Sequence, residues 1–179
     1  MKDKIPVHIK VDHELYLRSL ENSDKGNLVK YANNKAIWEN LMDGFPHPYT
    51  KKDADKWISY CLEKSKNVHL AIIYKEEYVG AIGAEFKEDI YRYSAELGYW
   101  IGEPFWGKGI LTRVIKSMVP FLFKTYKINR IFGNTFPKNI GSNKVLLKNG
   151  FKKEGVLRKA AFKDGFFIDL EVFGRLKDE

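Results

Sequence analysis

Two closely spaced glycines, Gly107 and Gly109, stand directly before a long segment with helical apolar spacing. Glycine lets the backbone turn tightly, and the first N–H groups of a helix have no partner within it. A turn of this kind can present several N–H donors to an anion at the positive end of the helix. The spacing therefore indicates a phosphate-binding loop, with a plain glycine turn between a strand and a helix as the alternative interpretation.

The two best-known phosphate motifs do not fit this segment. Gly102, Gly107 and Lys108 have the Walker A spacing, but Gly109 stands where a Ser or Thr would hold Mg²⁺. Thr112 stands where the third glycine of a Rossmann fingerprint would be. We therefore expect neither nucleotide hydrolysis nor NAD binding.

A second polar group follows about thirty residues later. Asn139 is placed to cap a short helix, and Ser142 would then lie one turn along that helix. Taken alone, Asn139 could simply cap and Ser142 could simply be solvated. Together with the glycine turn, they predict small polar groups that converge near the ends of adjacent elements.

The elements that would position these residues alternate between strand and helix patterns. Strands are predicted at 15–19, 69–74, 78–86, 94–101 and 130–136, with a three-residue turn at 75–77 and a final hairpin of 152–158 and 166–173 around 163–165. Helices are predicted from 22 or 23 to about 33, from a capping box at 50 and 53 to about 66, from 109 to about 126, and from 140 to 149 with Gly150 as the closing residue. Three successive strands with short connections imply an antiparallel meander rather than a doubly wound parallel sheet.

Length and composition describe one globular domain. The 179 residues have a net charge of +8 and a pI near 9.3, which favours anionic partners such as nucleic acid or a phosphorylated cofactor. The one cysteine, Cys61, excludes an internal disulfide and falls on a core-facing helix stripe, and the four histidines lack metal-ligand spacing. No signal peptide or membrane span is visible, so we expect a soluble, cytoplasmic protein with no metal.

Six segments form an ordered set of motifs: GFPHPYT at 44–50, AELGYWIG at 95–102, PFWGKGI at 104–110, NRI at 129–131, PKNIGS at 137–142 and LKNGFKKEG at 147–155. In these motifs the sequence resembles the GNAT superfamily of acetyl-CoA-dependent N-acetyltransferases, and within it the RimJ/RimL type. The likeness implies an N-acetyltransferase domain at 11–175, with 1–10 as an N-terminal extension. It also implies an α/β (α+β) fold with a mixed, mostly antiparallel sheet, flanked by helices and splayed between the fourth and fifth predicted strands.

The resemblance further implies that acetyl-CoA is the cosubstrate and lies between the splayed strands. Its pyrophosphate would accept hydrogen bonds from the main-chain N–H groups of Trp106, Gly107, Lys108, Gly109 and Ile110. Its pantetheine arm would run beside Trp100 and Ile101, Asn139 would contact CoA, and Ser142 would hydrogen-bond the departing sulfur. Pro104 departs from the Gln or Arg of the wider superfamily and is associated with the RimJ/RimL type.

Acetyl transfer to an amine needs a deprotonated amine, a polarised carbonyl and a stabilised thiolate. The residues favour direct transfer, because no nucleophile with an adjacent base is discernible. A main-chain N–H near Ile101 would polarise the carbonyl. Glu96 and Glu85 are the candidate bases, although a water relay could replace either and Glu96 could equally be a salt-bridged structural residue.

The sequence says less about the binding site of the acceptor than about the binding site of acetyl-CoA. Phe45, His47 and Tyr49 lie in a proline-rich loop whose rings need either the core or a ligand as partner, and His47 could line the acceptor entrance. We expect the acceptor to be a primary amine, either the N-terminus of a ribosomal or other protein or a small molecule. The alternative is a catalytically silent acyl-CoA-binding or basic RNA- or ribosome-binding module; nucleic acid is not required for the enzyme, and a homodimer is left open.

Overall fold

The protein, described by a computed structural model over residues 7–63 and 66–179, contains an eight-stranded sheet. The strands are β1 (His8–Lys10), β2 (Leu15–Ser19), β3 (Val68–Tyr74), β4 (Glu77–Phe86), β5 (Ser94–Ile101), β6 (Arg130–Thr135), β7 (Lys152–Lys163) and β8 (Phe166–Leu176). Their spatial order is β1-β2-β3-β4-β5-β6-β8-β7. All neighbours pair antiparallel except β5 and β6, which are parallel.

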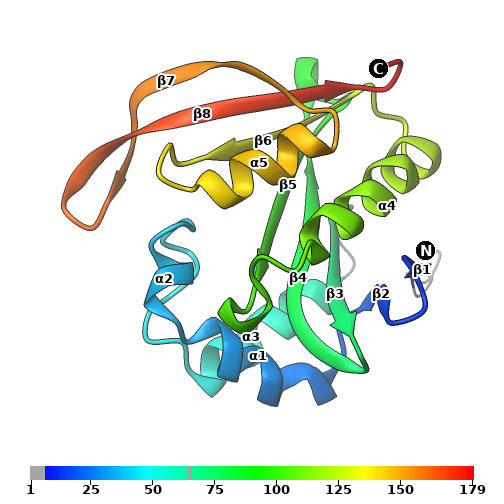
Figure 1. Cartoon of the computed structure of the whole chain (residues 1–179), viewed down its shortest axis with the longest axis vertical. Helices are drawn as coiled ribbons and strands as arrows, with labels where there is room; N and C mark the ends of the chain where they lie inside the picture. Colours follow the sequence, from blue (N-terminus) through cyan, green and yellow to red (C-terminus); the bar gives the residue numbers. More distant parts are fainter. Residues whose placement is uncertain (1–6, 64–65) are drawn as a thin grey trace.

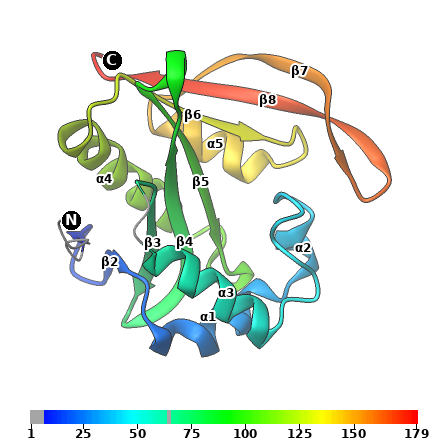
Figure 2. The same cartoon turned by 180° about the vertical axis from the view of Figure 1, so that it is seen from behind.

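Helices cover both faces of this sheet (Figures 1 and 2). The helices are α1 (Lys25–Ala32), α2 (Lys35–Trp38), α3 (Lys51–Leu62), α4 (Ile110–Thr125) and α5 (Ile140–Lys148), with 3-10 turns at Asn22–Asp24, Asp89–Tyr91 and Glu103–Phe105. Helices α4 and α5 lie on one face, and α1 and α3 lie on the other (Figures 1 and 2). The tip of the β7–β8 hairpin projects beyond the other strands on the side of α2 (Figure 1).

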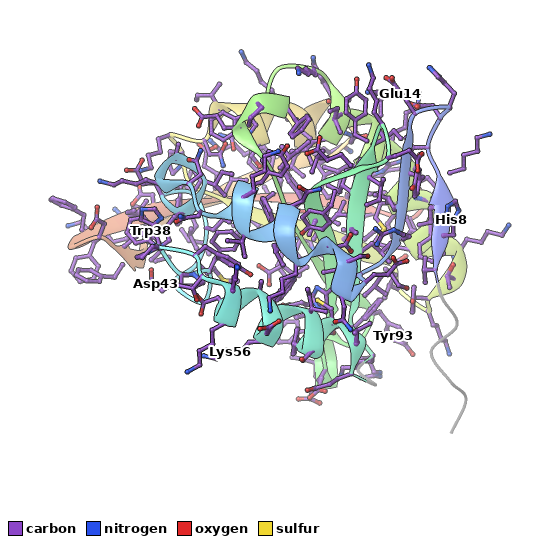
Figure 3. All side chains as sticks on the ribbon, turned by 90° about the horizontal axis from the view of Figure 1, so that it is seen from below. His8, Glu14, Trp38, Asp43, Lys56 and Tyr93 are labelled. Atoms are coloured by element: carbon purple, nitrogen blue, oxygen red, sulfur yellow. The ribbon has the colours of Figure 1, made fainter. Side chains whose placement is uncertain are left out.

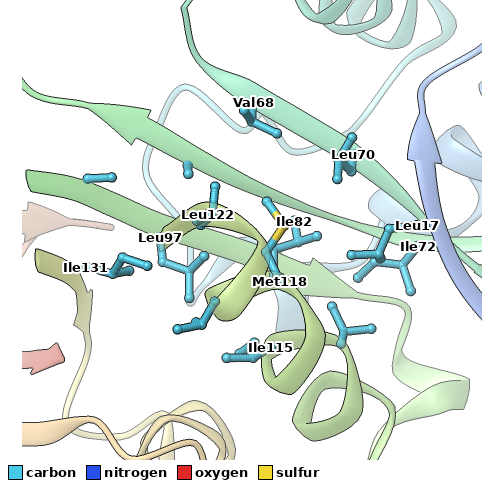
Figure 4. Packing of buried hydrophobic residues seen from close by; sticks show 14 of the residues in the cluster. Leu17, Val68, Leu70, Ile72, Ile82, Leu97, Ile115, Met118, Leu122 and Ile131 are labelled. Atoms are coloured by element: carbon cyan, nitrogen blue, oxygen red, sulfur yellow. The ribbon is translucent and has the colours of Figure 1, made fainter. Parts of the chain in front are cut away.

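The two faces have separate hydrophobic cores because side chains alternate along each strand. The core under α4 includes Leu97, Ile115 and Met118 (Figure 4). The core under α1 and α3 includes Ile58 and Trp100. Neighbouring residues of β5 thus belong to opposite faces of the sheet, and this division decides which side of the molecule each part of the site faces.

The expected fold class is confirmed, since the sheet is mixed, mostly antiparallel and flanked by helices. Strands 15–19 and 94–101 have the predicted bounds, and Cys61 is buried in the core under α1 and α3. Thr50 and Asp53 form the predicted capping box of α3. Gly150 closes α5 with a positive φ of 78°.

Several predicted bounds were wrong. Helix α3 ends at Leu62 rather than near 66. The first hairpin turns on two residues, Lys75 and Glu76, which both have positive φ, so Glu77 belongs to β4. Strand β7 continues to Lys163, past the predicted end at 158. The prediction stopped too early because a register shift between 157 and 161 interrupts the side-chain alternation of the strand.

The described part of the N-terminal segment takes part in the sheet, since His8–Lys10 pairs with β2 as an edge strand that the sequence did not predict. The domain bounds of 11–175 and 1–10 stay a prediction. Across residues 7–63 and 66–179, every helix is too short or too polar to cross a membrane.

Candidate functional site

Strands β5 and β6 pair only at their beginnings. Ser94, Ala95 and Glu96 face Arg130, Ile131 and Phe132, and the pairing then stops although both strands continue. The later half of β5, from Leu97 to Ile101, therefore has a sheet partner in β4 but none in β6. This is the splay between the fourth and fifth predicted strands, which are β5 and β6 in the structure.

The main chain of β5 points its free polar groups toward this divergence. Gly102 N–H donates to Val79 O on the β4 side, and in an antiparallel pair successive residues alternate in direction. The main-chain groups of Tyr99 and Ile101 consequently point away from β4. The Ile101 carbonyl bears this out, because it accepts a hydrogen bond from Trp106 Nε1 at 2.9 Å instead of joining the sheet. Donors suited to polarising a carbonyl thus border the place where the strands part.

The glycine turn follows directly after β5. Gly107 and Gly109 have φ values of 73° and 70°, a left-handed conformation that other residues rarely adopt. In the part of the chain that the structure describes, no main-chain oxygen accepts from the N–H groups of Gly107, Lys108, Gly109 or Ile110. Space is also open where a Cβ at either glycine would lie. A phosphate group could therefore approach these donors closely.

Trp106 differs from its neighbours in this loop. Its main-chain N–H donates to Glu103 O at 3.0 Å and closes the 3-10 turn at Glu103–Phe105. The indole Nε1 of Trp106 donates to the Ile101 carbonyl, and the residue is 45% exposed. Of the five N–H groups expected to face a pyrophosphate, those of 107–110 are available and that of Trp106 is engaged locally.

The second polar group takes the predicted local form. Asn139 Oδ1 accepts from Ser142 N–H at 3.1 Å, so Asn139 caps α5 and holds Ser142 in its first turn. Ser142 Oγ lies 2.7 Å from the hydroxyl of Tyr99 on β5. Burial raises the pKa of Tyr99 to about 12, so this phenol is neutral at physiological pH. A pair of hydroxyls thus joins β5 to α5 on the α4/α5 face, beside the diverging strands.

The candidate bases lie on the opposite face. Glu85 and Glu96 are cross-strand partners in the β4–β5 ladder, so their side chains are neighbours. Glu96 pairs with Lys87 at 2.5 Å and accepts from Asn134 Nδ2 at 3.1 Å. Glu85 is exposed. The structure therefore places the two residues side by side on adjacent strands, with Glu96 held in an ion pair at the closed end of the splay.

The same face of β5 is open between Glu96 and Trp100. Gly98 lies between them, is exposed, and has nothing within 4 Å of the position of a Cβ. At the far end, Phe45 packs edge-on against Trp100, with ring centroids 5.6 Å apart. The structure thus leaves room for a ligand on this strand, bounded by a carboxylate at one end and by aromatic rings at the other.

The three predicted acceptor-loop residues have different surroundings. Tyr49 is buried beside Phe45, with ring centroids 5.1 Å apart, and burial raises the pKa of its phenol. His47 is exposed and its ring lies 5.9 Å from that of Trp38. Phe45 and His47 thus border solvent on the open side of the loop, whereas Tyr49 belongs to the core.

Sequence reasoning missed two residues of this site. Tyr99 alternates in step with Leu97 and Ile101, so its side chain lies on the same face of the strand as theirs. This alternation was the feature of the sequence that could have placed Tyr99 on the α4/α5 face. Gly98 has no side chain and left no signal beyond its presence in a strand. Within the described residues, no group of three His, Cys, Asp or Glu side chains is placed to hold a metal ion.

A family model and several proteins resemble this chain over most of its length. Residues 14–152 match the family model described as the acetyltransferase (GNAT) domain. The probable N-acetyltransferase YjcK of Bacillus subtilis is 31% identical, over 92% of this chain and 95% of its own. The ribosomal-protein-serine acetyltransferase of Escherichia coli is 26% identical, over 95% of this chain and 97% of its own.

Two solved structures have the same fold. The ribosomal L7/L12 alpha-N-protein acetyltransferase RimL, in complex with coenzyme A, superposes with a TM-score of 0.86 at 24% identity, covering 96% of this chain and 99% of that one. The microcin C7 self immunity acetyltransferase MccE, in complex with acetyl-CoA and AMP, has a TM-score of 0.81 at 26% identity, with coverage of 93% and 94%.

Proposed function

The chain belongs to the acetyltransferase (GNAT) family and is an N-acetyltransferase, and we propose that it passes the acetyl group of acetyl-CoA directly to a primary amine where β5 parts from β6. Acetyl-CoA supplies a thioester, whose carbonyl an amine can attack with a thiolate as leaving group. One observation carries the proposal: the pairing of β5 with β6 stops after Glu96, beside a glycine turn with unpaired donors.

The residues on the α4/α5 face fit the cosubstrate. The N–H groups of Gly107, Lys108, Gly109 and Ile110 would hold the pyrophosphate at the start of α4. Ile101 borders the path from this loop to the divergence, and its N–H would polarise the carbonyl. The main chain of Trp100 lies on the same path, whereas its ring packs in the core under α1 and α3. Asn139 fixes the first turn of α5 and offers its amide to the same ligand.

Ser142 is the residue we assign to the departing sulfur. A thiolate leaves more readily when a donor stabilises its charge, and the Ser142 hydroxyl lies in the first turn of α5, where the helix dipole favours a negative charge. The neutral Tyr99 hydroxyl is hydrogen-bonded to that serine and can replace the proton it gives, after which the Tyr99 oxygen takes a proton back from solvent water. A two-hydroxyl relay thereby delivers a proton to sulfur without a buried charged acid.

The acceptor would approach from the other face. Glu85 and Glu96 place negative charge beside Gly98, which attracts a protonated amine. Glu96 lies five residues from Ile101, about 16 Å along the strand at about 3.3 Å per residue, so Glu96 cannot take the proton directly from an amine that attacks a carbonyl held by the Ile101 N–H. We propose that Glu96 receives that proton through water, with Phe45 and His47 at the entrance.

The experiment follows CoA release with a thiol reagent and acetyl-CoA binding by calorimetry. The amines are N-terminal peptides, polyamines and aminoglycosides. Gly98→Val should abolish amine-dependent release and leave acetyl-CoA binding within about twofold, because Val suits a strand and fills only the open face. Gly107→Val should lose acetyl-CoA binding. Gly26→Val, at an exposed glycine of α1 with open surroundings, is the matched control.

Either of two results would overturn the proposal. Binding of acetyl-CoA without release for every amine would leave an acyl-CoA-binding module. Equal release by wild type and Gly98→Val would place the acceptor elsewhere. The amine that supports the fastest release identifies the acceptor as a protein N-terminus or a small molecule.

A further inference from the structure

Lys163, at the end of β7, is buried although it is a lysine. Its side chain is only 4% exposed, and its Nζ lies 2.8 Å from Asp43 Oδ1 and 3.8 Å from the centre of the Trp38 ring. Lysine is rarely buried to this extent without a partner for its charge. Here both an ion pair and a cation–π contact supply one. We call these three residues the clasp.

The clasp joins two parts of the molecule that are far apart in sequence. Trp38 ends α2 and Asp43 lies in the loop that follows, whereas Lys163 is 120 residues away from Asp43 at the tip of the β7–β8 hairpin. Trp38 and Asp43 lie together on the side of the molecule from which the hairpin projects (Figure 3). Asp43 is 74% exposed, so the carboxylate is solvated by itself and the lysine is the member that depends on the contact.

The clasp completes a closed circuit of contacts around the proposed acceptor face. Phe45 of the loop packs on Trp100 of β5, and β5 pairs with β6. Strand β6 pairs with β8, and β8 pairs with β7 out to Lys163. From there the clasp returns to the loop. Exposed Gly98 lies on the β5 side of this circuit, so the open face described above is encircled.

The circuit is small compared with a folded protein. Its β8 side runs from the last β6 pair at Glu171 to Phe166 opposite Lys163, and five residues of strand span about 16 Å. Side chains take up part of that span. If the acceptor enters inside this ring of contacts, a slender chain with a free end needs no change in the ring, whereas an amine flanked by bulk needs the clasp to open.

We propose that Lys163 is a specificity-determining residue, which by holding the hairpin tip to Trp38 and Asp43 admits slender amines with a free end and excludes bulky ones. This inference rests on the proposed acceptor face. His47, which was predicted to line the entrance, packs on the same Trp38 ring, so opening the clasp also releases the entrance residue. The ion pair has one exposed partner, and a bulky acceptor must break it before entry.

The test compares three variants with wild type. Lys163→Met keeps an unbranched apolar side chain, shorter by one heavy atom, and removes the charge. Lys163→Arg keeps both the ion pair and the cation–π contact. Arg158→Met removes a positive charge from an exposed position on the same strand and is the matched control. Hydrogen exchange at 39–46 and 158–166 reports whether the clasp is closed, independently of turnover.

Activity is measured as kcat/KM for a slender amine, such as an extended N-terminal peptide or a linear polyamine, and for an aminoglycoside as the bulky amine. Lys163→Met should raise exchange in both segments and raise the bulky-to-slender ratio about tenfold, with the KM for acetyl-CoA unchanged. Lys163→Arg and Arg158→Met should keep wild-type exchange and ratio.

Three other outcomes would each overturn either this proposal or the proposed function. Faster exchange with an unchanged ratio in Lys163→Met would overturn the proposal, because the clasp would then hold the hairpin without selecting acceptors. Unchanged exchange would overturn it as well, because Lys163 would not hold the hairpin at all. Absence of release by wild type with every amine, alongside normal exchange changes, would instead overturn the proposed function.

Discussion

The hydroxyl pair of Tyr99 and Ser142 provides the sharpest test of the chemistry. The two oxygens lie 2.7 Å apart between β5 and α5, and burial keeps the phenol neutral with a pKa of about 12. If Ser142 donates to the departing sulfur, Ser142→Ala should lower kcat about 100-fold, the loss seen when one preorganised donor is removed. That factor equals about 2.7 kcal/mol of transition-state stabilisation.

Tyr99→Phe should lower kcat by a smaller factor, about tenfold, because Ser142 keeps its place on the Asn139 cap and loses only its proton source. If the two hydroxyls act as a unit, the double variant should be no slower than Ser142→Ala alone. The coupling free energy from the double-mutant cycle would then equal the Tyr99 effect, about 1.4 kcal/mol.

The assay is single-turnover CoA release under saturating acetyl-CoA, with binding of acetyl-CoA measured separately. Tyr126→Phe is the control, because this phenol is half-buried, its pKa is also raised by burial, and it packs on Phe86 at the other end of the sheet. An unchanged kcat in Ser142→Ala would refute the role of the serine. Losses that multiply in the double variant would refute the relay, because they would mean independent actions.

Three further predictions follow from particular contacts. Gly109→Ala places a Cβ in open space at a φ of 70°, so it should cost about 1 kcal/mol of stability in urea unfolding and weaken acetyl-CoA binding more than tenfold. Arg18 donates two hydrogen bonds, of 2.7 and 2.8 Å, to the carboxylate of Asp24, a residue that is 4% exposed. Asp24→Asn removes this negative charge and should therefore lower the free energy of unfolding by about 3 kcal/mol in the same assay. Tyr99 has a raised pKa, so the folded state keeps a proton that the unfolded state loses, and its contribution of about 2.7 kcal/mol should disappear as pH rises from 10 through 12. Comparing wild type with Tyr99→Phe in urea unfolding at pH 9 and 11.5 measures this, and equal stability losses in the two proteins would contradict it.

The parts of the fold that sequence predicted are those fixed by local physics. The Thr50–Asp53 capping box and the Asn139 cap need only residues three apart, and both formed as expected. The left-handed turns at Gly107 and Gly109 follow from the absence of a Cβ. Local rules of this kind located the candidate phosphate loop and the first turn of α5 before any tertiary contact was known.

The parts that sequence missed depend on distant segments. Tyr99 meets Ser142 across 43 residues, and Lys163 meets Asp43 across 120. The sequence around Tyr99 and around Lys163 contains no local pattern that indicates which distant residue is the partner. The end of β7 was missed for a related reason, because the register shift between 157 and 161 removes the alternation by which a strand is recognised.

The alternation of one strand explains how two ligands can meet at this site. Along β5, Tyr99 and Ile101 face α4 and α5, whereas Glu96, Gly98 and Trp100 face α1 and α3. In a continuous sheet these faces would be sealed from each other by the next strand. Because β6 leaves β5 after Glu96, the edge of β5 is free, and groups bound on opposite faces can come into contact around it. A substitution that extended the β5–β6 pairing would therefore remove catalysis while leaving each binding face intact. The proposed reaction thus depends on the divergence of the two strands more than on any single side chain.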